Sequence, residues 1–476
     1  MYVNCFDPVF FISYVMSNYR IESDLLGEKN VPEEAYYGIQ TLRAIENFRI
    51  SHTTLSTYPV FVKNLVLVKK AAALTNFRLG LLPEQAFKAI DEACDKIMNG
   101  TYTDQFPIDL FQGGAGTSTN MNTNEVIANV ALEILGYRKG AYQHISPNDH
   151  VNLSQSTNDA YPTALKLAIY DMNASLLPVL ERLEQSLEAK AAAFKNVIKM
   201  GRTQLQDAVP MTLGQEFGGF AFLIRQAIKD LQKAGDSLLE VNMGATAIGT
   251  GINAPQGFSN GCAAALSELK GVTVIPTENL IAATSDTTVF VEYAAYLKKL
   301  ALKLTKICND LRLLSSGPRT GFNEIRLPQR QPGSSIMPGK INPVIPEVVN
   351  QICYKVIGNE LTITLAAENA QLQLNVMEPV IALSLFESIH LLYNGINTLT
   401  DECINGIEAN AEQTREMVLN SIGIVTALNP YIGYKASSEV AKEALASHKR
   451  VYDVVLDQAL LSREELDRYL NPEKMV

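Results

Sequence analysis

Apolar residues recur at helical spacing over long stretches of the second half of the chain. The clearest case is a seam in which the steps alternate between three and four residues: Phe290, Tyr293, Leu297, Leu300, Leu304, Ile307, Leu311 and Leu314. A narrow seam of this length is typical of helices packed in a bundle and not of one helix lying on a sheet. The pattern therefore predicts a long bundle helix over this stretch.

Other stretches repeat the pattern, at 176–187, 217–238, about 346–376 and about 380–410. No window shows the alternation of a half-buried strand. The sequence thus predicts an all-α protein whose core is a bundle of about five long helices. One chain would leave such apolar seams exposed, so we expect the bundle to be shared with other copies of the chain.

The chain of 476 residues is long enough for more than one domain. We expect an N-terminal domain at 16–155, a central bundle domain at 156–412 and a small helical C-terminal domain at 413–476. Residues 1–15 contain an apolar run, but no basic residue precedes it and Met16 follows it. The sequence therefore predicts an upstream extension without function at 1–15, with a weak signal peptide as the alternative.

The formal charge of −10 argues against nucleic acid or an anionic membrane surface as a partner. The six cysteines are scattered without a C-x-x-C pair, which suggests neither a disulfide framework nor a zinc site. The longest apolar runs fall well short of a membrane span. These features predict a protein of a reducing compartment, the cytoplasm, with no nucleic acid and no membrane among its partners.

Residues 333–343, GSSIMPGKINP, form the most informative stretch of the chain. Its glycines and prolines exclude a regular helix or a central strand. Four of its side chains donate hydrogen bonds and none is a carboxylate: Ser334, Ser335, Lys340 and Asn342. A phosphate loop is excluded, because five residues separate Gly333 from Gly339 where four are needed. The stretch predicts a loop that holds a small anion or stabilises an oxyanion, with a plain surface turn as the alternative.

Hydroxyl and amide side chains gather in two other stretches, at 112–125 and 147–162, and a third short stretch, 201–207, reads GRTQLQD. Taken alone, each is consistent with a structural turn or a helix cap. A helix N-terminus can also bind a carboxylate, because its free N–H groups and its dipole favour negative charge. Both roles therefore stay open for these stretches.

These stretches closely resemble the signature regions of the aspartase/fumarase superfamily and follow one another along the chain in the expected order. The resemblance runs from about residue 20 to the C-terminus. It implies a homotetramer with active sites shared between subunits, and no organic cofactor. We expect no metal among the site residues, and the sequence leaves activation by a divalent metal open.

The resemblance also implies a role for each candidate residue. Ser334 is the catalytic base, and the remaining candidates bind the substrate: Thr117, Ser156, Thr157, Asn158, Thr203, Gln204, Ser335, Lys340 and Asn342. Among these, Thr203, Lys340 and Asn342 are expected to hold the α-carboxylate. Asn158 is expected to help place the amine.

The implied reaction is the reversible deamination of L-aspartate to fumarate and ammonium through an enediolate. The alternative within the superfamily is a class II-type fumarase, which hydrates fumarate to malate. Fumarases usually carry a histidine where this chain has Gln204, which favours deamination. A catalytically silent bundle scaffold is the alternative from another class, and intact Ser334, Lys340 and Asn342 weigh against it.

Overall fold

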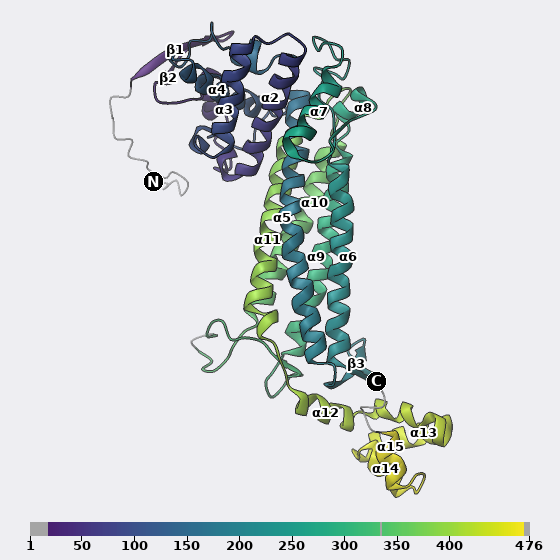
Figure 1. Cartoon of the computed structure of the whole chain (residues 1–476). Helices are drawn as coiled ribbons and strands as arrows, with labels where there is room; N and C mark the ends of the chain where they lie inside the picture. Colours follow the sequence, from purple (N-terminus) through teal and green to yellow (C-terminus); the bar gives the residue numbers. More distant parts are fainter. Residues whose placement is uncertain (1–17, 334–335, 471–476) are drawn as a thin grey trace. The chain divides into compact units, whose positions relative to one another are not determined.

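The computed structural model describes residues 18–333 and 336–470 and consists mainly of helices (Figure 1). The all-α class expected from the sequence is confirmed. The chain divides into two compact units. The first unit comprises 1–172, 236–291 and 362–386, and the second comprises 173–235, 292–361 and 387–476. The division at 155/156 and 412/413 stays a prediction. Residues 1–15, Ser334 and Ser335 lie outside the described residues.

The first unit opens with an antiparallel hairpin of β1 (Tyr19–Asp24) and β2 (Gly27–Pro32). The buried Arg20 guanidinium ties it to the following loop. It donates to the Glu22 carboxylate at 2.7 Å and to the backbone oxygens of Ala35 and Tyr37 at 2.7 and 2.6 Å. These charge-assisted hydrogen bonds fix the extended chain beside a small buried cluster of Val31, Ala35 and Ile39.

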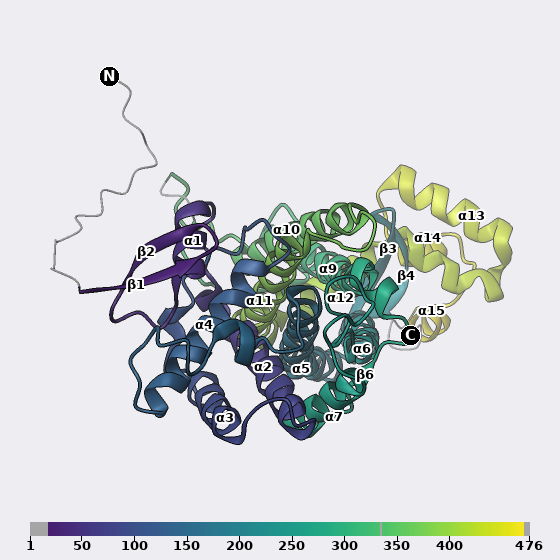
Figure 2. The ribbon, with the colours of Figure 1, turned by 90° about the horizontal axis from the view of Figure 1, so that it is seen from above.

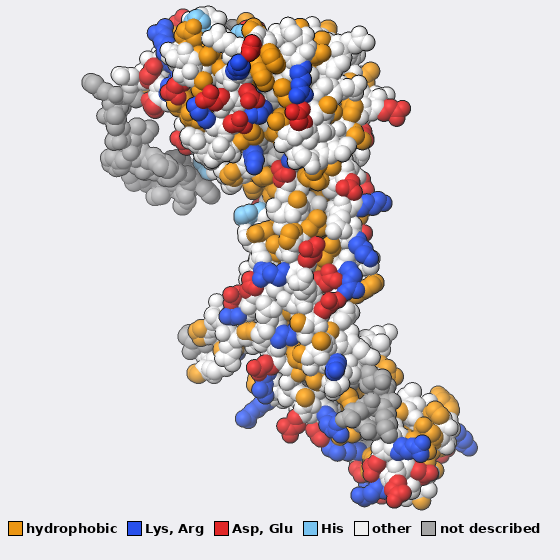
Figure 3. Space-filling model, in the orientation of Figure 1, with side chains coloured by type: hydrophobic (Ala, Val, Ile, Leu, Met, Phe, Trp, Pro, Cys, Tyr) orange, Lys and Arg blue, Asp and Glu red, His pale blue; other side chains and the backbone are white. Residues whose placement is uncertain are grey.

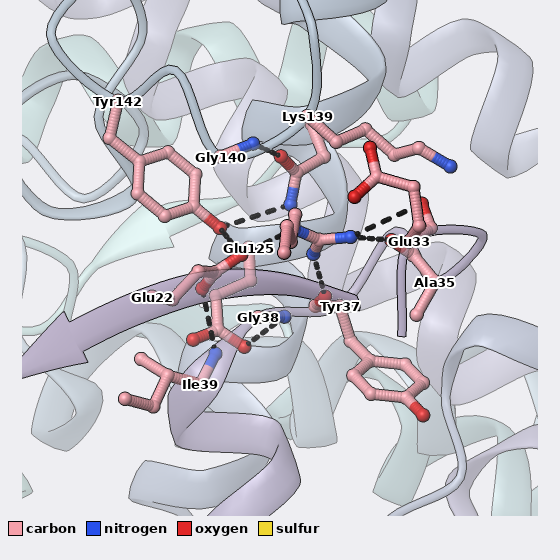
Figure 4. Close-up of polar contacts among 12 residues, drawn as sticks. Glu22, Glu33, Ala35, Tyr37, Gly38, Ile39, Glu125, Lys139, Gly140 and Tyr142 are labelled. Atoms are coloured by element: carbon pink, nitrogen blue, oxygen red, sulfur yellow. Dashed lines mark hydrogen bonds and ion pairs between the residues drawn. The ribbon is translucent and has the colours of Figure 1, made fainter. Parts of the chain in front are cut away.

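Helix α1 (Ile39–Asn47) begins against α4 (Thr117–Ile134). The buried Glu125 carboxylate of α4 accepts hydrogen bonds from backbone N–H groups at the start of α1: Gly38, Gln40 and Thr41. Figure 4 shows Glu125 and Glu22 converging on this helix start. The carboxylates accept hydrogen bonds from N–H groups that lack intrahelical partners. They therefore cap α1 although neither residue is its neighbour in the sequence.

The rest of the first unit is a cluster of helices with one very short parallel strand pair. Its further elements are α2 (Pro59–Arg78), α3 (Glu84–Met98), β5 (Glu240–Val241), α7 (Phe258–Lys270), β6 (Ile275–Pro276) and α8 (Leu280–Ser285). The unit also contains the beginnings of the bundle helices α5 (Thr157–Ala193), α9 (Thr288–Leu314) and α11 (Glu378–Glu402), and the end of α10 (Val344–Glu368).

Helices α5, α6 (Leu213–Ser237), α9 (Thr288–Leu314), α10 (Val344–Glu368) and α11 run side by side and are seen end-on in Figure 2. These are the five long helices predicted from the apolar seams. By length and composition one stretch of the described residues, Glu378–Gly406, is apolar enough to cross a membrane. However, 61% of its most apolar window is buried inside the protein, which is the behaviour of a core helix.

The seam along α9 is buried within one chain, with exposed fractions between 0% and 4% from Phe290 to Leu314. The expectation that other subunits must cover this seam is therefore wrong. The five helices close around the seam, and a different set of apolar side chains stays exposed. In the second unit this set includes Phe222, Leu302, Tyr354 and Leu361, and Figure 3 shows hydrophobic side chains on the outer face of the bundle.

A β-hairpin of β3 (Ile198–Thr203) and β4 (Gln206–Thr212) connects α5 and α6, where the sequence predicted no strand. Its two turn residues, Gln204 and Leu205, have φ values of +54° and +62°. Such tight turns are normally signalled by Asn-Gly or Asp-Gly. Neither residue gives that signal, so the pattern of the sequence does not reveal the hairpin.

The second unit ends with a short strand pair and four helices. These are β7 (Ile325–Arg326) with β8 (Glu408–Ala409), then α12 (Ala411–Asn420), α13 (Asn429–Ser447), α14 (Val451–Asp457) and α15 (Arg463–Tyr469). A capping box of Ser462 and Glu465 starts α15. The small helices pack around a separate apolar cluster that includes Val418, Val440, Val454 and Leu466.

Candidate functional site

Thr117 is the first residue of α4 and is exposed. The turn before it places Gly114, Ala115 and Gly116 at positive φ, between +54° and +88°. The Thr117 hydroxyl donates to the Gly114 carbonyl at 2.7 Å, so its oxygen keeps free acceptor positions. The helix start presents N–H groups and the positive end of a dipole, which suits a carboxylate ligand.

The start of α5 carries three more candidates, Ser156, Thr157 and Asn158. The Ser156 hydroxyl accepts from the Asn158 N–H at 3.2 Å, and the Asp159 carboxylate accepts from the Ser156 N–H at 3.0 Å. This reciprocal cap explains why the helix begins here. The Asn158 side-chain nitrogen donates to the Ala247 carbonyl at 2.7 Å, so one of its N–H groups is engaged by the backbone.

Tyr161, one turn into α5, brings these two helix starts together. A Cβ built on Gly116 would lie 2.3 Å from Cδ2 of the Tyr161 ring, so the ring rests directly on the glycine. The ring is fully buried and meets Phe61 edge-on at 5.4 Å. Thr117 and the Ser156–Asn158 segment are thereby held in one region of the first unit. No local sequence pattern indicates the role of Tyr161, because only long-range packing defines it.

A pocket of about 410 Å³ lies beside the start of α5. One wall is formed by residues between Asn148 and Ser156, and the other by Thr246, Ala247, Ile252 and Asn253. Ser156 is the predicted site residue that lines it. The walls offer hydroxyls, amides and backbone groups, which suits a small polar ligand.

Thr203 and Gln204 lie in the second unit, exposed at the tip of the β3–β4 hairpin. A buried ion-pair network anchors the hairpin near its tip. The carboxylate of Glu324 pairs with Arg202 at 2.5 Å and with Lys199 at 3.1 Å. The ion pairs therefore fix the position of the hairpin next to its tip. In a single chain the two candidate side chains at the tip face solvent.

The loop at 333–343 is closed by a backbone hydrogen bond of 2.8 Å from the Gly333 N–H to the Lys340 carbonyl. A Cβ at Gly333 would lie 2.2 Å from that carbonyl oxygen, so the closure requires glycine. Lys340 is exposed and Asn342 is half-buried. Ser334 and Ser335 are predictions that fall outside the described residues.

The candidates that the structure describes thus divide between the two units. Thr117, Ser156, Thr157 and Asn158 belong to the first, and Thr203, Gln204, Lys340 and Asn342 to the second. Among the residues that the structure describes, no hydrogen bond joins Lys340 or Asn342 to Thr203 or Gln204. Within those ranges no group of three or more His, Cys, Asp or Glu side chains could hold a metal ion. The roles assigned from the resemblance stay predictions.

Comparison with known proteins gives close relatives along nearly the whole chain. It is 54% identical to the aspartate ammonia-lyase of Escherichia coli K12 over 461 residues, covering 97% of this chain and 96% of the relative. The aspartate ammonia-lyase of Pseudomonas aeruginosa is 56% identical over 458 residues, covering 96% and 97%.

Solved structures share the fold as well. The fumarate lyase:delta crystallin of Brucella melitensis bound to cobalt gives a TM-score of 0.94 at 52% identity, over 96% of this chain and 99% of that one. The class II fumarase of Schistosoma mansoni gives 0.91 at 36% identity, over 96% and 99%. A sequence profile described as Lyase matches residues 27–358, and one described as Fumarase C C-terminus matches 424–476. The chain therefore belongs to the lyase family that contains the aspartate ammonia-lyases.

Proposed function

We propose that this chain is a carbon–nitrogen lyase that catalyses the reversible deamination of L-aspartate to fumarate and ammonium. The observation that supports this most strongly is the likeness to aspartate ammonia-lyases over nearly the whole chain. Gln204 at the tip of the hairpin agrees with it, because the resemblance places a histidine there in fumarases. The proposal includes no organic cofactor.

The chemical difficulty of the reaction is the first proton transfer. The proton next to the β-carboxylate is very weakly acidic, and its removal places charge on that carboxylate as an enediolate. Hydrogen-bond donors fixed where this charge develops lower the barrier by several kcal/mol. We assign this task to the hydroxyls of Thr117, Ser156 and Thr157, and to Ser335 of the loop. The N-termini of α4 and α5 add dipoles of the right sign.

Ser334 acts as the base and takes the C3 proton. The C–N bond then breaks, and its electron pair leaves with the nitrogen as ammonia, which is protonated to ammonium. Serine is a poor base in water, so its oxyanion has to be stabilised by N–H groups and a nearby cation. Lys340 is the cation of the same loop.

The α-carboxylate is held by Thr203, Lys340 and Asn342, and Asn158 helps to place the amine. Lys340 and Asn342 lie on a loop that is closed by a hydrogen bond from Gly333. Thr203 lies on a hairpin that is fixed by the ion pair of Arg202 with Glu324. Gln204 orients the substrate but cannot relay a proton.

A homotetramer with shared active sites is part of the proposal. Its support is an exposed apolar stripe on α10, where Tyr354, Leu361 and Leu365 are 56%, 57% and 52% exposed. Monomeric proteins rarely leave such a stripe uncovered. A cytoplasmic location is also proposed, and the five cysteines of the described chain, all buried and free, are consistent with it.

The second candidate function is hydration of fumarate to malate, favoured by the likeness in fold to a class II fumarase. One assay separates the candidates, because the conjugated double bond of fumarate absorbs short-wavelength ultraviolet light much more strongly than aspartate or malate. Fumarate formed from aspartate supports the lyase, and fumarate formed from malate supports the fumarase. No product from either substrate would favour a silent scaffold.

A further inference from the structure

Asp159, in the first turn of α5, lies fully buried behind the pocket and joins its two walls. Its carboxylate accepts hydrogen bonds from the backbone N–H groups of Ser156 at 3.0 Å, Gly244 at 3.1 Å and Thr246 at 3.0 Å. Ser156 belongs to one wall of the pocket and Thr246 to the other. A single carboxylate therefore sets the spacing between the loop that carries the substrate-binding candidates and the loop that faces it.

The facing loop needs such support. Thr246 has a φ of +55°, a conformation that costs energy for a residue with a Cβ and persists only where its surroundings hold it. The next residue, Ala247, accepts the hydrogen bond from the Asn158 side chain. The placement of Asn158 thus depends on a strained segment that Asp159 fixes.

Lys69 of α2 supports the opposite end of the same segment. Its side chain is buried, and its ammonium donates to the side-chain oxygens of Asn152 at 2.9 Å and Gln155 at 3.0 Å. Both partners line the pocket, whereas Lys69 does not. The Asn152 oxygen also accepts from the Asn124 amide of α4 at 3.1 Å. Lys69 therefore acts on the pocket through Asn152 and Gln155.

We propose that Asp159 and Lys69 are buried positioning residues that fix the 152–158 segment in its catalytic geometry without touching the substrate. A buried charge is weak support for stability, because its desolvation offsets much of what its contacts contribute. Its effect is therefore expected in the placement of Ser156 and Asn158. The inference rests on the proposed function for its kinetic readout.

The titratable groups facing this pair set the expected pH dependence. Burial raises the pKa of Asp159 to about 6, and the nearby Lys69 charge opposes this. Burial lowers the pKa of Lys69 to about 7. The Cys262 thiol of α7 lies close enough to Asp159 for a Coulombic interaction, as does the Cys94 thiol of α3 to Lys69. Burial raises the pKa of both thiols, so both stay neutral. As pH falls through about 6, Asp159 gains a proton and one of its acceptor positions is lost, so turnover should fall.

The test replaces Asp159 by asparagine in the full chain and compares kinetics with aspartate. Asp159→Asn should lower kcat by about 10- to 100-fold, the effect of a small misplacement of contacting groups. The acid limb of the kcat profile near pH 6 should disappear, because the variant has no carboxyl to protonate. Asp171→Asn is the control: Asp171 lies on the same helix and pairs with Lys270 at 2.7 Å. It should lower thermal stability and leave kcat and the acid limb unchanged.

Hydrogen exchange provides a readout that does not depend on the reaction. The amides of Ser156, Gly244 and Thr246 should exchange faster in Asp159→Asn than in the wild type and in the control. Wild-type protein that forms no fumarate from aspartate would disprove the proposed function, and exchange would still test the positioning role. If Asp159→Asn fails to fold, Lys69→Gln should show the same loss of kcat. Unchanged exchange together with unchanged kcat in a folded variant would overturn the inference.

Discussion

The aromatic ring of Tyr161 lies directly on the backbone of Gly116, where a Cβ would fall 2.3 Å from the ring atom Cδ2. Gly116 precedes Thr117 at the start of α4, and Tyr161 follows Asn158 by one turn in α5. This contact joins two residues that lie 45 positions apart in the sequence. It requires a glycine both for the space and for its φ of +88°.

Gly116→Ala should therefore damage both the fold and the site. The added methyl group meets a fully buried ring, and overpacking of this kind costs about 1–3 kcal/mol of unfolding free energy. Turnover should fall as well, because α4 and Thr117 must shift. The matched control is Gly257→Ala, at the start of α7 with a φ of +87° and nothing within 4 Å of its Cβ. Urea unfolding and aspartate kinetics of both variants measure the difference, and equal effects in the two would contradict this packing argument.

Lys340→Met should raise KM for aspartate and lower kcat, because the proposal makes Lys340 the cation that holds the α-carboxylate. Lys340→Arg should recover part of the activity only, since a planar guanidinium and a compact ammonium bind carboxylates differently. Lys88→Met is the control: it removes an exposed lysine that pairs with Glu84 on the surface of α3. Steady-state kinetics of the variants measure these effects. Wild-type values of kcat and KM for Lys340→Met would exclude Lys340 as the cation that binds the α-carboxylate.

Charged substitutions on two leucines of the bundle should have opposite consequences. Leu300→Asp buries an unpaired carboxylate inside one chain, where Leu300 is 0% exposed, and should prevent folding. Leu361→Asp changes a side chain that is 57% exposed in one chain and should leave the subunit folded but dissociated. Activity should fall with dissociation, because the proposed sites are shared. Light scattering with circular dichroism separates these outcomes, and a fully active Leu361→Asp monomer would refute the shared site.

Glu378, the first residue of α11, gives a prediction for pH and stability. In the described chain its buried carboxyl has no hydrogen bond or ion pair, and burial raises its pKa to about 8, with the Lys166 charge opposing. A pKa raised on folding means that the folded state holds the proton more tightly. The contribution of this proton to the free energy of unfolding is fully present below the unfolded pKa near 4.5 and is lost as pH rises toward 8.

Glu378→Gln should therefore be more stable than the wild type at pH 8–9, by up to a few kcal/mol, and the difference should vanish near pH 4. Glu464→Gln, exposed on α15, is the control. Denaturant unfolding at several pH values measures the difference. A constant gap between wild type and Glu378→Gln across that range would show that Glu378 does not titrate as argued.

The sequence predicts the parts of the structure that depend on local patterns. The repeat of apolar residues from Phe290 to Leu314 indicates a bundle helix, because burial of one helix face imposes that spacing. Ser156 and Asp159 form a recognisable cap, so the start of α5 could be expected. The division of the candidate residues between two units could not be predicted, because local sequence patterns do not indicate which distant segments pack together.

The residues that the sequence does not reveal act through distant partners. Lys69 stands in a helical stretch beside Lys70, and both look like solvent-facing residues. Only the fold shows that Lys69 is buried against Asn152 and Gln155. The sequence pattern does not reveal the β3–β4 hairpin for a different reason, since Gln204 and Leu205 adopt a conformation that their types rarely take.

The most direct test of the proposed function compares kcat/KM for L-aspartate and L-malate on the wild-type protein, with fumarate formation as the readout. Ammonia leaves from aspartate without help, whereas hydroxide leaving from malate needs a proton that Gln204 cannot deliver. We predict a preference for aspartate of at least about a thousandfold, roughly 4 kcal/mol in transition-state binding. Comparable kcat/KM values for the two substrates, or turnover of malate alone, would contradict the proposal and favour a fumarase.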